Sequence, residues 1–332
     1  MTERIQIGNA ALAVTDPASA DSARRITARV LEAVSDAADR HRSDSEITRV
    51  NARAADGPVQ QRISAVLASV LHASIAAHHR TDGLVTPTVG AALTAWGFGS
   101  DDRGPIAAPR RRPGRVPLPQ LHGQDLAMTA GTALDLGAIT GPWSADTIAR
   151  QIVAATGSGV LVNVDGNIAV AGPAPHDGWH VLVGDGLDVD VATAGASARQ
   201  PLARIAITGG GLATSSTIAR NRQVQRGPRI TDVCDIIDPR MGEPVGRFFR
   251  TVSVTAPSCV VANTISLQAV VAGRPAINRL RRWGQTARLV QWDGSIVHTG
   301  RWPADSELTG AGHAGSDYPV AHLHTHELKE LA

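Results

Sequence analysis

Apolar residues recur along most of the chain at the spacings of strands and amphipathic helices. Residues 5–14 (IQIGNAALAV) predict a strand that breaks or turns near its middle, at a Gly-Asn pair. Within 20–41, apolar side chains return every three or four positions, which predicts a helix. A second helix is expected over 59–83, where an Asp-Gly pair ends the pattern. Residues 41–51 (HRSDSEITRVN) then form a polar loop between the two helices.

The second half of the chain alternates between short apolar runs and turn residues. Helices are expected over 142–156, with a proline in the first turn, and over 261–273. Strands are expected at 133–139, running into a glycine turn, and at 159–172, 179–187, 204–216, 232–239, 251–257 and 287–300. This mixture predicts an α/β fold of the α+β kind, with mixed, largely antiparallel sheets flanked by helices.

No repeat or long linker divides the sequence, so a single domain over 1–332 is expected. Residues 101–122 are rich in Pro and Arg and predict a flexible excursion, and 312–332 predict a C-terminal tail. That tail carries His322, His324 and His326, which would share one face of a strand and could bind a transition metal. A solvated tail is the simpler interpretation.

Composition narrows the class of protein. With 32 basic and 30 acidic residues, the chain offers no electrostatic argument for binding nucleic acid or a membrane surface. Cys234 and Cys259 are too few for a disulfide framework and are expected to be buried apolar residues in a reducing compartment. No apolar run is long enough for a signal segment or a membrane span, so we expect a cytoplasmic protein.

Four turns at predicted strand ends collect Gly, Ser, Thr and Asn. They lie within 133–141, 162–167, 208–216 and 256–263. Glycine lets a backbone approach a ligand closely, and free N–H groups at turns and helix starts bind anions. Together these turns predict a pocket for a phosphorylated ligand.

The order of the polar stretches resembles the ApbE-like family of FAD:protein FMN transferases, over about residues 7 to 300. The stretches that carry the resemblance are IGN (7–9), HRSDSEITRVN (41–51), TDGLVTPTVGAALTAWGFG (81–99), LDLGAITGPWSAD (134–146), LVNVDGNIAVAG (161–172), LATSS (212–216), CDIIDPRMGEP (234–244) and VTAPSCVVAN (254–263).

The resemblance implies a T-fold-type domain that binds FAD and uses Mg²⁺ to cleave the diphosphate. The FMN half then passes to a Ser or Thr hydroxyl of a target flavoprotein. By position, the metal ligands would be the Ala138 carbonyl and Asn263, and the proton acceptor would be Asp235. The FAD contacts would be Ile7, His41, Trp96, Gly97, Phe98, Asp135 and Gly141.

Several of these positions depart from the family pattern. Asn263 stands where the family has a carboxylate, and Leu267 stands where it has a hydroxyl ligand. Thr264 or Ser266 could replace that hydroxyl. Aspartate replaces the family histidine at 235, and glycine replaces the family lysine at 141. These changes predict weak dependence on Mg²⁺.

Alternatives remain open at this point. Trp96 and Phe98 could face the flavin or belong to the core, and Ser45 could cap a helix instead of serving a ligand. Asp235 could be a turn residue paired with Arg240. For the whole chain, we consider an active transferase, a flavin-nucleotide-binding protein that has lost catalysis, and a scaffold without a ligand.

Overall fold

The structure is a computed structural model and describes residues 2–99, 105–109, 116–184, 203–303 and 320–321. Its centre is an eight-stranded sheet in the order β1-β2-β7-β8-β11-β16-β17-β18, in which every neighbouring pair is antiparallel. The strands are β1 (Glu3–Ile7), β2 (Ala10–Val14), β7 (Val160–Val164), β8 (Asn167–Ala171), β11 (Gly210–Ser216), β16 (Phe249–Ala256), β17 (Ala287–Gln291) and β18 (Ile296–Thr299).

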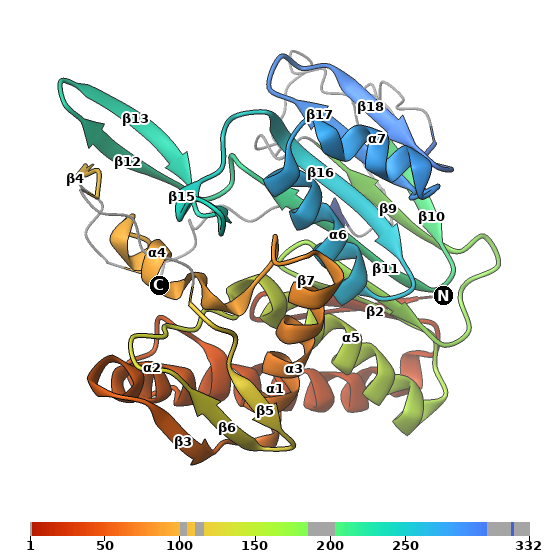
Figure 1. The fold of residues 1–332 in the computed structure, drawn as a ribbon. Coiled ribbons are helices and arrows are strands. Elements are labelled where there is room, and N and C mark those ends of the chain that lie inside the picture. The colour runs from red at the N-terminus through yellow and green to blue at the C-terminus, as the bar shows by residue number, and fades with distance from the viewer. Residues whose placement is uncertain (1, 100–104, 110–115, 185–202, 304–319, 322–332) are drawn as a thin grey trace.

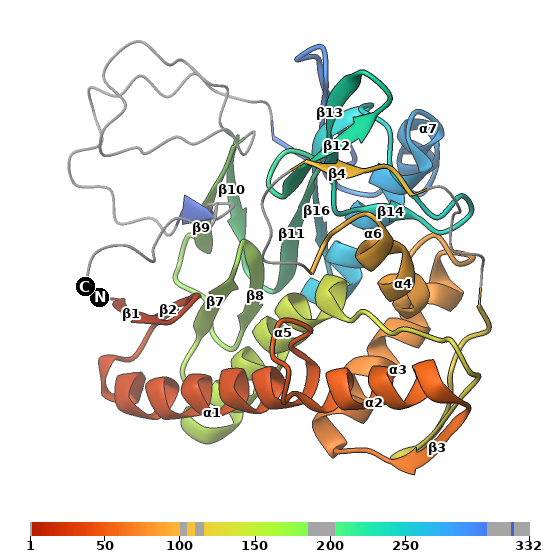
Figure 2. The ribbon, with the colours of Figure 1, turned by 90° about the vertical axis from the view of Figure 1, so that its left-hand side faces the viewer.

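Successive side chains of a strand point to opposite faces, and both faces of this sheet are apolar. In β7, Val160, Val162 and Val164 face the helices, whereas Leu161 faces the other way. The helical layer consists of α1 (Ala20–Ala38), α5 (Gly137–Thr156), α6 (Cys259–Ala272) and α7 (Pro275–Arg282). The opposite face packs on β9 (Trp179–Val183) and β10 (Ala203–Ile207), and β9 also pairs with β19 (Val320–Ala321) (Figure 2).

A second apolar cluster lies beside the helical layer. It joins α2 (Glu46–Asp56) and α3 (Ala65–Arg80) to a small sheet of β3 (Val59–Arg62), β6 (Asp125–Met128) and β5 (Gln120–His122). Leu134, Leu136 and Ile139, which surround the start of α5, are buried in the same cluster. Helix α5 therefore joins the two clusters, with its start in this one and its later turns in the main core.

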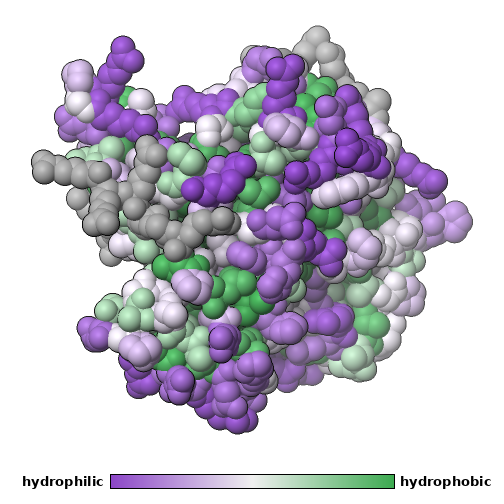
Figure 3. All heavy atoms as spheres, viewed as in Figure 1, coloured by the Kyte–Doolittle hydropathy of each residue, from purple (hydrophilic) through white to green (hydrophobic). Residues whose placement is uncertain are grey.

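A third group of elements forms the ribbon lobe, which we define as η2 (Pro87–Val89), α4 (Gly90–Ala95), β4 (Ile106–Ala107), β12 (Asn221–Arg226), β13 (Arg229–Cys234), β14 (Ile237–Asp238) and β15 (Glu243–Pro244). Its β12–β13 hairpin projects from the body (Figure 1), and its outer surface is hydrophilic (Figure 3). A short 3-10 turn, η1 (Pro17–Ser19), precedes α1.

The expected fold class is confirmed, because the sheets are mixed, largely antiparallel and flanked by helices. Several local predictions were wrong, among them the single strand at 204–216, which forms two strands of different sheets, β10 and β11. Residues 46–56 form α2 instead of a loop, and 59–62 form a strand ahead of α3. Residues 133–136 form no strand, and α5 begins at Gly137, so Pro142 lies inside the helix. Helix α7 was not predicted.

Part of the predicted segment at 101–122, and most of that at 312–332, falls outside the described residues. Within 101–122, the described parts include β4, which pairs with β12, and β5, which pairs with β6. Of the tail at 312–332, only β19 is described, so His322, His324 and His326 lie outside the described residues.

Candidate functional site

The segment before α5 is fixed from two sides. The Asn51 side chain on α2 donates to the Leu134 carbonyl and accepts from the Leu134 N–H, both at 2.8 Å. Next to it, the Asp135 N–H donates to the Pro87 carbonyl at 2.8 Å. Gly90 packs against the same segment so closely that a Cβ would lie 2.7 Å from the Ala133 carbonyl oxygen. These contacts set the position of Asp135.

The two oxygens of Asp135 bind different partners. Oδ1 accepts the Gly137 N–H at 3.0 Å, in the first turn of α5. Oδ2 accepts from Arg40 Nη1 at 2.6 Å, and this ion pair is mostly buried, with 8% of the Asp135 side chain exposed. Arg40 follows the end of α1, so one carboxylate joins α1 to the start of α5.

His41 lies beside this pair, since Arg40 Nε donates to His41 Nε2 at 3.2 Å. Partial burial of the ring lowers the pKa of His41, and the positive charge of Arg40 lowers it further. A neutral ring is consistent with accepting that hydrogen bond. His41 is exposed, so its ring can still contact a ligand.

Asp235 lies in the link between β13 and β14, close to the same charges. Its Oδ2 is 3.8 Å from Arg220 Nη1, and its N–H donates to the Arg220 carbonyl. Burial raises the pKa of Asp235 and the nearby Asp135 carboxylate adds to this effect, while Arg220 and Arg40 oppose it. Two carboxylates and two guanidinium groups therefore gather at the start of α5.

The expected turn pairing of Asp235 with Arg240 was wrong. Arg240 instead binds Asp238, with Nη2 2.7 Å from Oδ2. The carboxylate that raises the pKa of Asp235 is that of Asp135, which is distant in the sequence. Arg40 and Arg220 were missed altogether. The only sequence signal for Arg40 was its place next to His41.

The Ala138 carbonyl has an unusual partner. In a regular helix it would accept the N–H of the residue four positions on, but that residue is Pro142, which has no N–H. Asn263 of α6 takes this place, and its Nδ2 donates to Ala138 O at 2.6 Å. The reverse orientation of the amide would set two acceptor oxygens against each other at this distance.

A divalent cation does not fit these residues. The side chain at 263 donates a hydrogen bond to the very carbonyl that would be a metal ligand. Leu267 packs in the apolar cluster of α2 and α3. Thr264 and Ser266 donate to carbonyls of α6 itself, at Val260 and Asn263. Among the described residues, no group of three or more His, Cys, Asp or Glu side chains could hold a metal.

Gly141 and Ile7 belong to a neighbouring corner of the site. A Cβ at Gly141 would lie 2.8 Å from Nδ2 of Asn167, so this side chain covers the position of the family lysine. Asn167 begins β8, just after the β7–β8 turn, and Asp165 of that turn accepts from Asn9 at 2.6 Å. Ile7 ends β1 directly before the turn that holds Asn9.

The Trp96-Gly97-Phe98 segment belongs to the ribbon lobe. Trp96 is 2% exposed, and its Nε1 donates to the Gly242 carbonyl at 2.9 Å. A Cβ at Gly97 would lie within 3 Å of Arg222 Nε, and Phe98 packs against the same cluster as Trp96. For Trp96, the burial favours the core interpretation over a flavin-facing wall.

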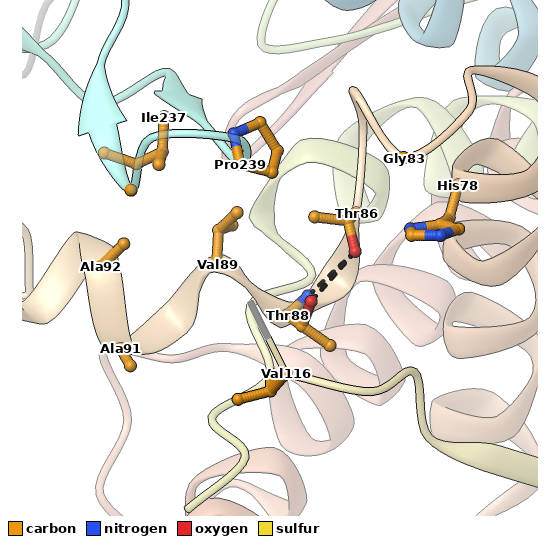
Figure 4. A pocket seen from close by; sticks show the side chains of 11 residues that line it. His78, Gly83, Thr86, Thr88, Val89, Ala91, Ala92, Val116, Ile237 and Pro239 are labelled. Atoms are coloured by element: carbon orange, nitrogen blue, oxygen red, sulfur yellow. Dashed lines mark hydrogen bonds between the residues drawn. The ribbon is translucent and has the colours of Figure 1, made fainter. Parts of the chain in front are cut away.

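A pocket opens in the ribbon lobe, between η2, α4 and the β14–β15 turn (Figure 4). Its empty volume, which includes space open to solvent, is about 510 Å³. Its wall is mostly apolar, with the hydroxyls of Thr86 and Thr88 3.1 Å apart. None of the predicted site residues lines it.

Several residues from the polar stretches hold the fold together. Ser45 is fully buried and its Oγ accepts the Thr48 N–H, so it caps α2 as the alternative interpretation proposed. Asp146 accepts the Cys259 and Val260 N–H groups at the start of α6, at 2.9 and 3.0 Å. Cys234 and Cys259 are free and buried, as expected.

Comparison with known proteins identifies the family, since the ApbE family model matches residues 4–290. The chain belongs to the ApbE family. The FAD:protein FMN transferase of Vibrio cholerae is 28% identical over 280 residues, which cover 78% of this chain and 77% of that protein. The FAD:protein FMN transferase of Salmonella typhimurium is 25% identical, over 78% of this chain and 74% of that protein.

Solved structures agree on the ApbE fold. The flavin transferase ApbE from Vibrio cholerae has a TM-score of 0.67 at 21% identity, covering 91% of this chain and 98% of that one. The ApbE protein from Thermotoga maritima has a TM-score of 0.70 at 18% identity, covering 90% and 97%. The expected resemblance to a flavinyltransferase family is thus confirmed. Among the described residues of this ApbE member, no helix is long and apolar enough to cross a membrane.

Proposed function

We propose that the chain binds FAD at the start of α5 and transfers FMN to a Ser or Thr hydroxyl of a target flavoprotein. The observation that carries this proposal is the fixed group of Arg40, Asp135, Arg220 and Asp235 beside the first turn of a helix. Guanidinium groups and the dipole at a helix start both favour a diphosphate. The FMN-transfer reaction is proposed because the chain belongs to the ApbE family.

In this proposal Asp235 accepts the proton of the acceptor hydroxyl. The hydroxyl oxygen forms a bond to the phosphorus of the FMN half, the bond to the AMP half breaks, and AMP leaves. A carboxylate is a better base near neutral pH when its pKa is raised. Burial raises the pKa of Asp235, which supports this role.

A second candidate is a flavin-nucleotide-binding protein without transfer activity. The observation that favours it is the hydrogen bond from Asn263 to Ala138 O. The two groups at the family's metal-ligand positions bind each other in this chain instead of a metal. A reducing, cytoplasmic location remains a prediction from the sequence for either candidate.

An intact-mass assay separates the two. The protein would be incubated with FAD and a flavoprotein domain that the Vibrio cholerae enzyme modifies, with Mg²⁺ or with EDTA. A mass gain equal to FMN on the domain supports transfer. Bound FAD without a mass gain supports the binding protein, and the absence of saturable FAD binding contradicts both.

Asp235→Asn tests the proton acceptor, with Asp232→Asn on the adjoining strand β13 as a matched control. Asp232 is exposed, and its carboxylate lies 3.8 Å from Arg247 Nη2. We expect Asp235→Asn to slow transfer at least tenfold while FAD binding persists. Equal rates for both variants would show that Asp235 is a bystander.

A further inference from the structure

We propose that Arg40 supplies the fixed positive charge on the diphosphate of FAD, in place of a divalent cation. This inference rests on the proposed function, since it assumes that FAD lies at the start of α5. It assigns to this chain a residue that the sequence comparison with the family did not single out.

The first support is the place of Arg40. Through Asp135 its guanidinium is joined to the Gly137 N–H, by contacts of 2.6 and 3.0 Å to the two oxygens of one carboxylate. Arg40 therefore stands beside the first turn of α5, where the helix dipole already favours negative charge. A diphosphate at that turn would lie within reach of the guanidinium.

The second support is how Arg40 is held. Nη1 binds Asp135 and Nε binds His41, so the planar group is fixed before any ligand arrives. Among the described residues, Nη2 has no hydrogen-bond partner. An oriented N–H pair is thus left for a ligand, and a fixed guanidinium binds phosphate oxygens without losing side-chain entropy.

The third support is that the positions which carry a bound cation or a lysine in the family offer no positive charge in this chain. The Ala138 carbonyl is occupied by Asn263, Leu267 offers no ligand atom, and the lysine position is Gly141 under Asn167. Binding a diphosphate without a cation would leave two negative charges uncompensated in a site that also holds Asp135 and Asp235. Arg220 can add charge, but it is 57% exposed and only loosely paired, whereas Arg40 is 20% exposed and fixed.

The test is FAD affinity in EDTA, measured by flavin fluorescence over a range of NaCl concentrations. The variants are Arg40→Ala, Arg40→Lys and the control Arg42→Ala. Arg42 is a nearby arginine whose ion pairs with Asp36 and Asp44 are at the surface. We expect Arg40→Ala to lose roughly ten- to a hundredfold in affinity, as for a charge-assisted hydrogen bond. Arg40→Lys should lose less, and Arg42→Ala should match wild type.

The dependence of FAD affinity on NaCl concentration distinguishes two roles of Arg40, direct binding of the diphosphate and positioning of Asp135. If Arg40 binds the diphosphate, wild-type affinity falls with NaCl and Arg40→Ala flattens this dependence. If Arg40 only positions Asp135, Arg40→Ala weakens binding and keeps the wild-type salt dependence, which overturns the proposal. Arg40→Lys, which keeps the charge, should keep the dependence as well.

Restoring the metal ligands gives an independent check. In the Arg40→Ala background, Asn263→Asp with Leu267→Thr should let Mg²⁺ recover most of the lost FAD affinity. The proposal that Arg40 replaces Mg²⁺ would be overturned if EDTA abolished FAD binding by the wild type. It would also be overturned if Mg²⁺ did not restore FAD affinity to the triple variant. If wild type shows no saturable FAD binding at all, the proposed function itself fails, and the two failures are distinguishable.

Discussion

A single proline explains the chemistry at Asn263. Pro142 takes away the helical donor of Ala138 O, and Asn263 donates to this carbonyl in a part-buried hydrogen bond, so the amide of Asn263 is a structural partner in this chain. A carboxylate at 263 would repel that carbonyl unless a cation lay between them. The change from carboxylate to amide is thus physically linked to the loss of the metal site.

This link predicts a non-additive pair of substitutions. Asn263→Leu should lower the free energy of unfolding by about 1–3 kcal/mol, because it leaves Ala138 O without a donor. In a Pro142→Ala background the loss should be clearly smaller, since the introduced alanine would provide the helical N–H. Urea unfolding of the four proteins in a double-mutant cycle measures the difference. Equal losses in both backgrounds would contradict the assignment.

Asp235 should make stability depend on pH. Its folded pKa lies above the unfolded value of about 3.9, so the folded state binds the proton more tightly. The contribution of Asp235 to the free energy of unfolding therefore falls as pH rises from about 4 through the folded pKa, and is level above it. Asp235→Asn removes this loss.

We expect Asp235→Asn to match wild type in stability near pH 3.5 and to exceed it near pH 7, by urea unfolding at each pH. Asp232→Asn controls for the removal of an acidic side chain from the adjoining strand. A constant difference between Asp235→Asn and wild type across the pH range would show that Asp235 titrates alike in both states.

At the scale of elements, α2 reaches the site through one side chain. Asn51 forms two hydrogen bonds with the backbone of Leu134, next to Asp135. Asn51→Ala should lower the free energy of unfolding by about 1–3 kcal/mol, because two backbone groups of Leu134 lose their hydrogen-bond partner. It should also weaken FAD binding, because the backbone next to Asp135 is then no longer fixed. Asn221→Ala, which removes one exposed bond to Ile218 O, is the control. Weakened stability with unchanged FAD affinity would separate α2 from the site.

The elements that sequence reasoning found are those with one dominant pattern. The apolar runs at 159–172 and 287–300 were each predicted as a strand, and each is a pair of antiparallel strands joined by a turn, β7 with β8 and β17 with β18. The errors arose where two signals competed. The polar VQQR of β3 merged with the helix that follows, and Pro142 was taken for a helix start because proline is common there.

The site was harder to predict than the fold, because its charges meet only through tertiary contacts. Arg40 and Asp135 are 95 residues apart, and nothing local in the sequence pairs them. The position of Asn263 could be aligned with the family, but its partner could not be identified without knowing that Pro142 lies inside a helix. Sequence reasoning located the segments of the site, whereas the structure determines which charges act on one another.

At the scale of the whole molecule, the proposed FAD site joins parts with separate cores. Arg40 follows α1 of the main helical layer, and Asp135 lies between Leu134 and Leu136 of the α2–α3 cluster. Asp235 lies between Cys234 and Ile237, in the ribbon lobe. A ligand that touches all three should couple them, since each part can open only after releasing its contacts.

Hydrogen exchange with and without saturating FAD tests this coupling. We expect slower exchange at 39–46, 135–141 and 235–243, in EDTA as well as in Mg²⁺, and little change in the β17–β18 hairpin. FAD at a hundred times its Kd should also raise the free energy of unfolding by about 2.7 kcal/mol. Protection at 86–92 without protection at 135–141 would place the ligand in the pocket of Figure 4 instead. Arg40→Ala should then bind FAD like wild type, since none of its contacts reaches that pocket.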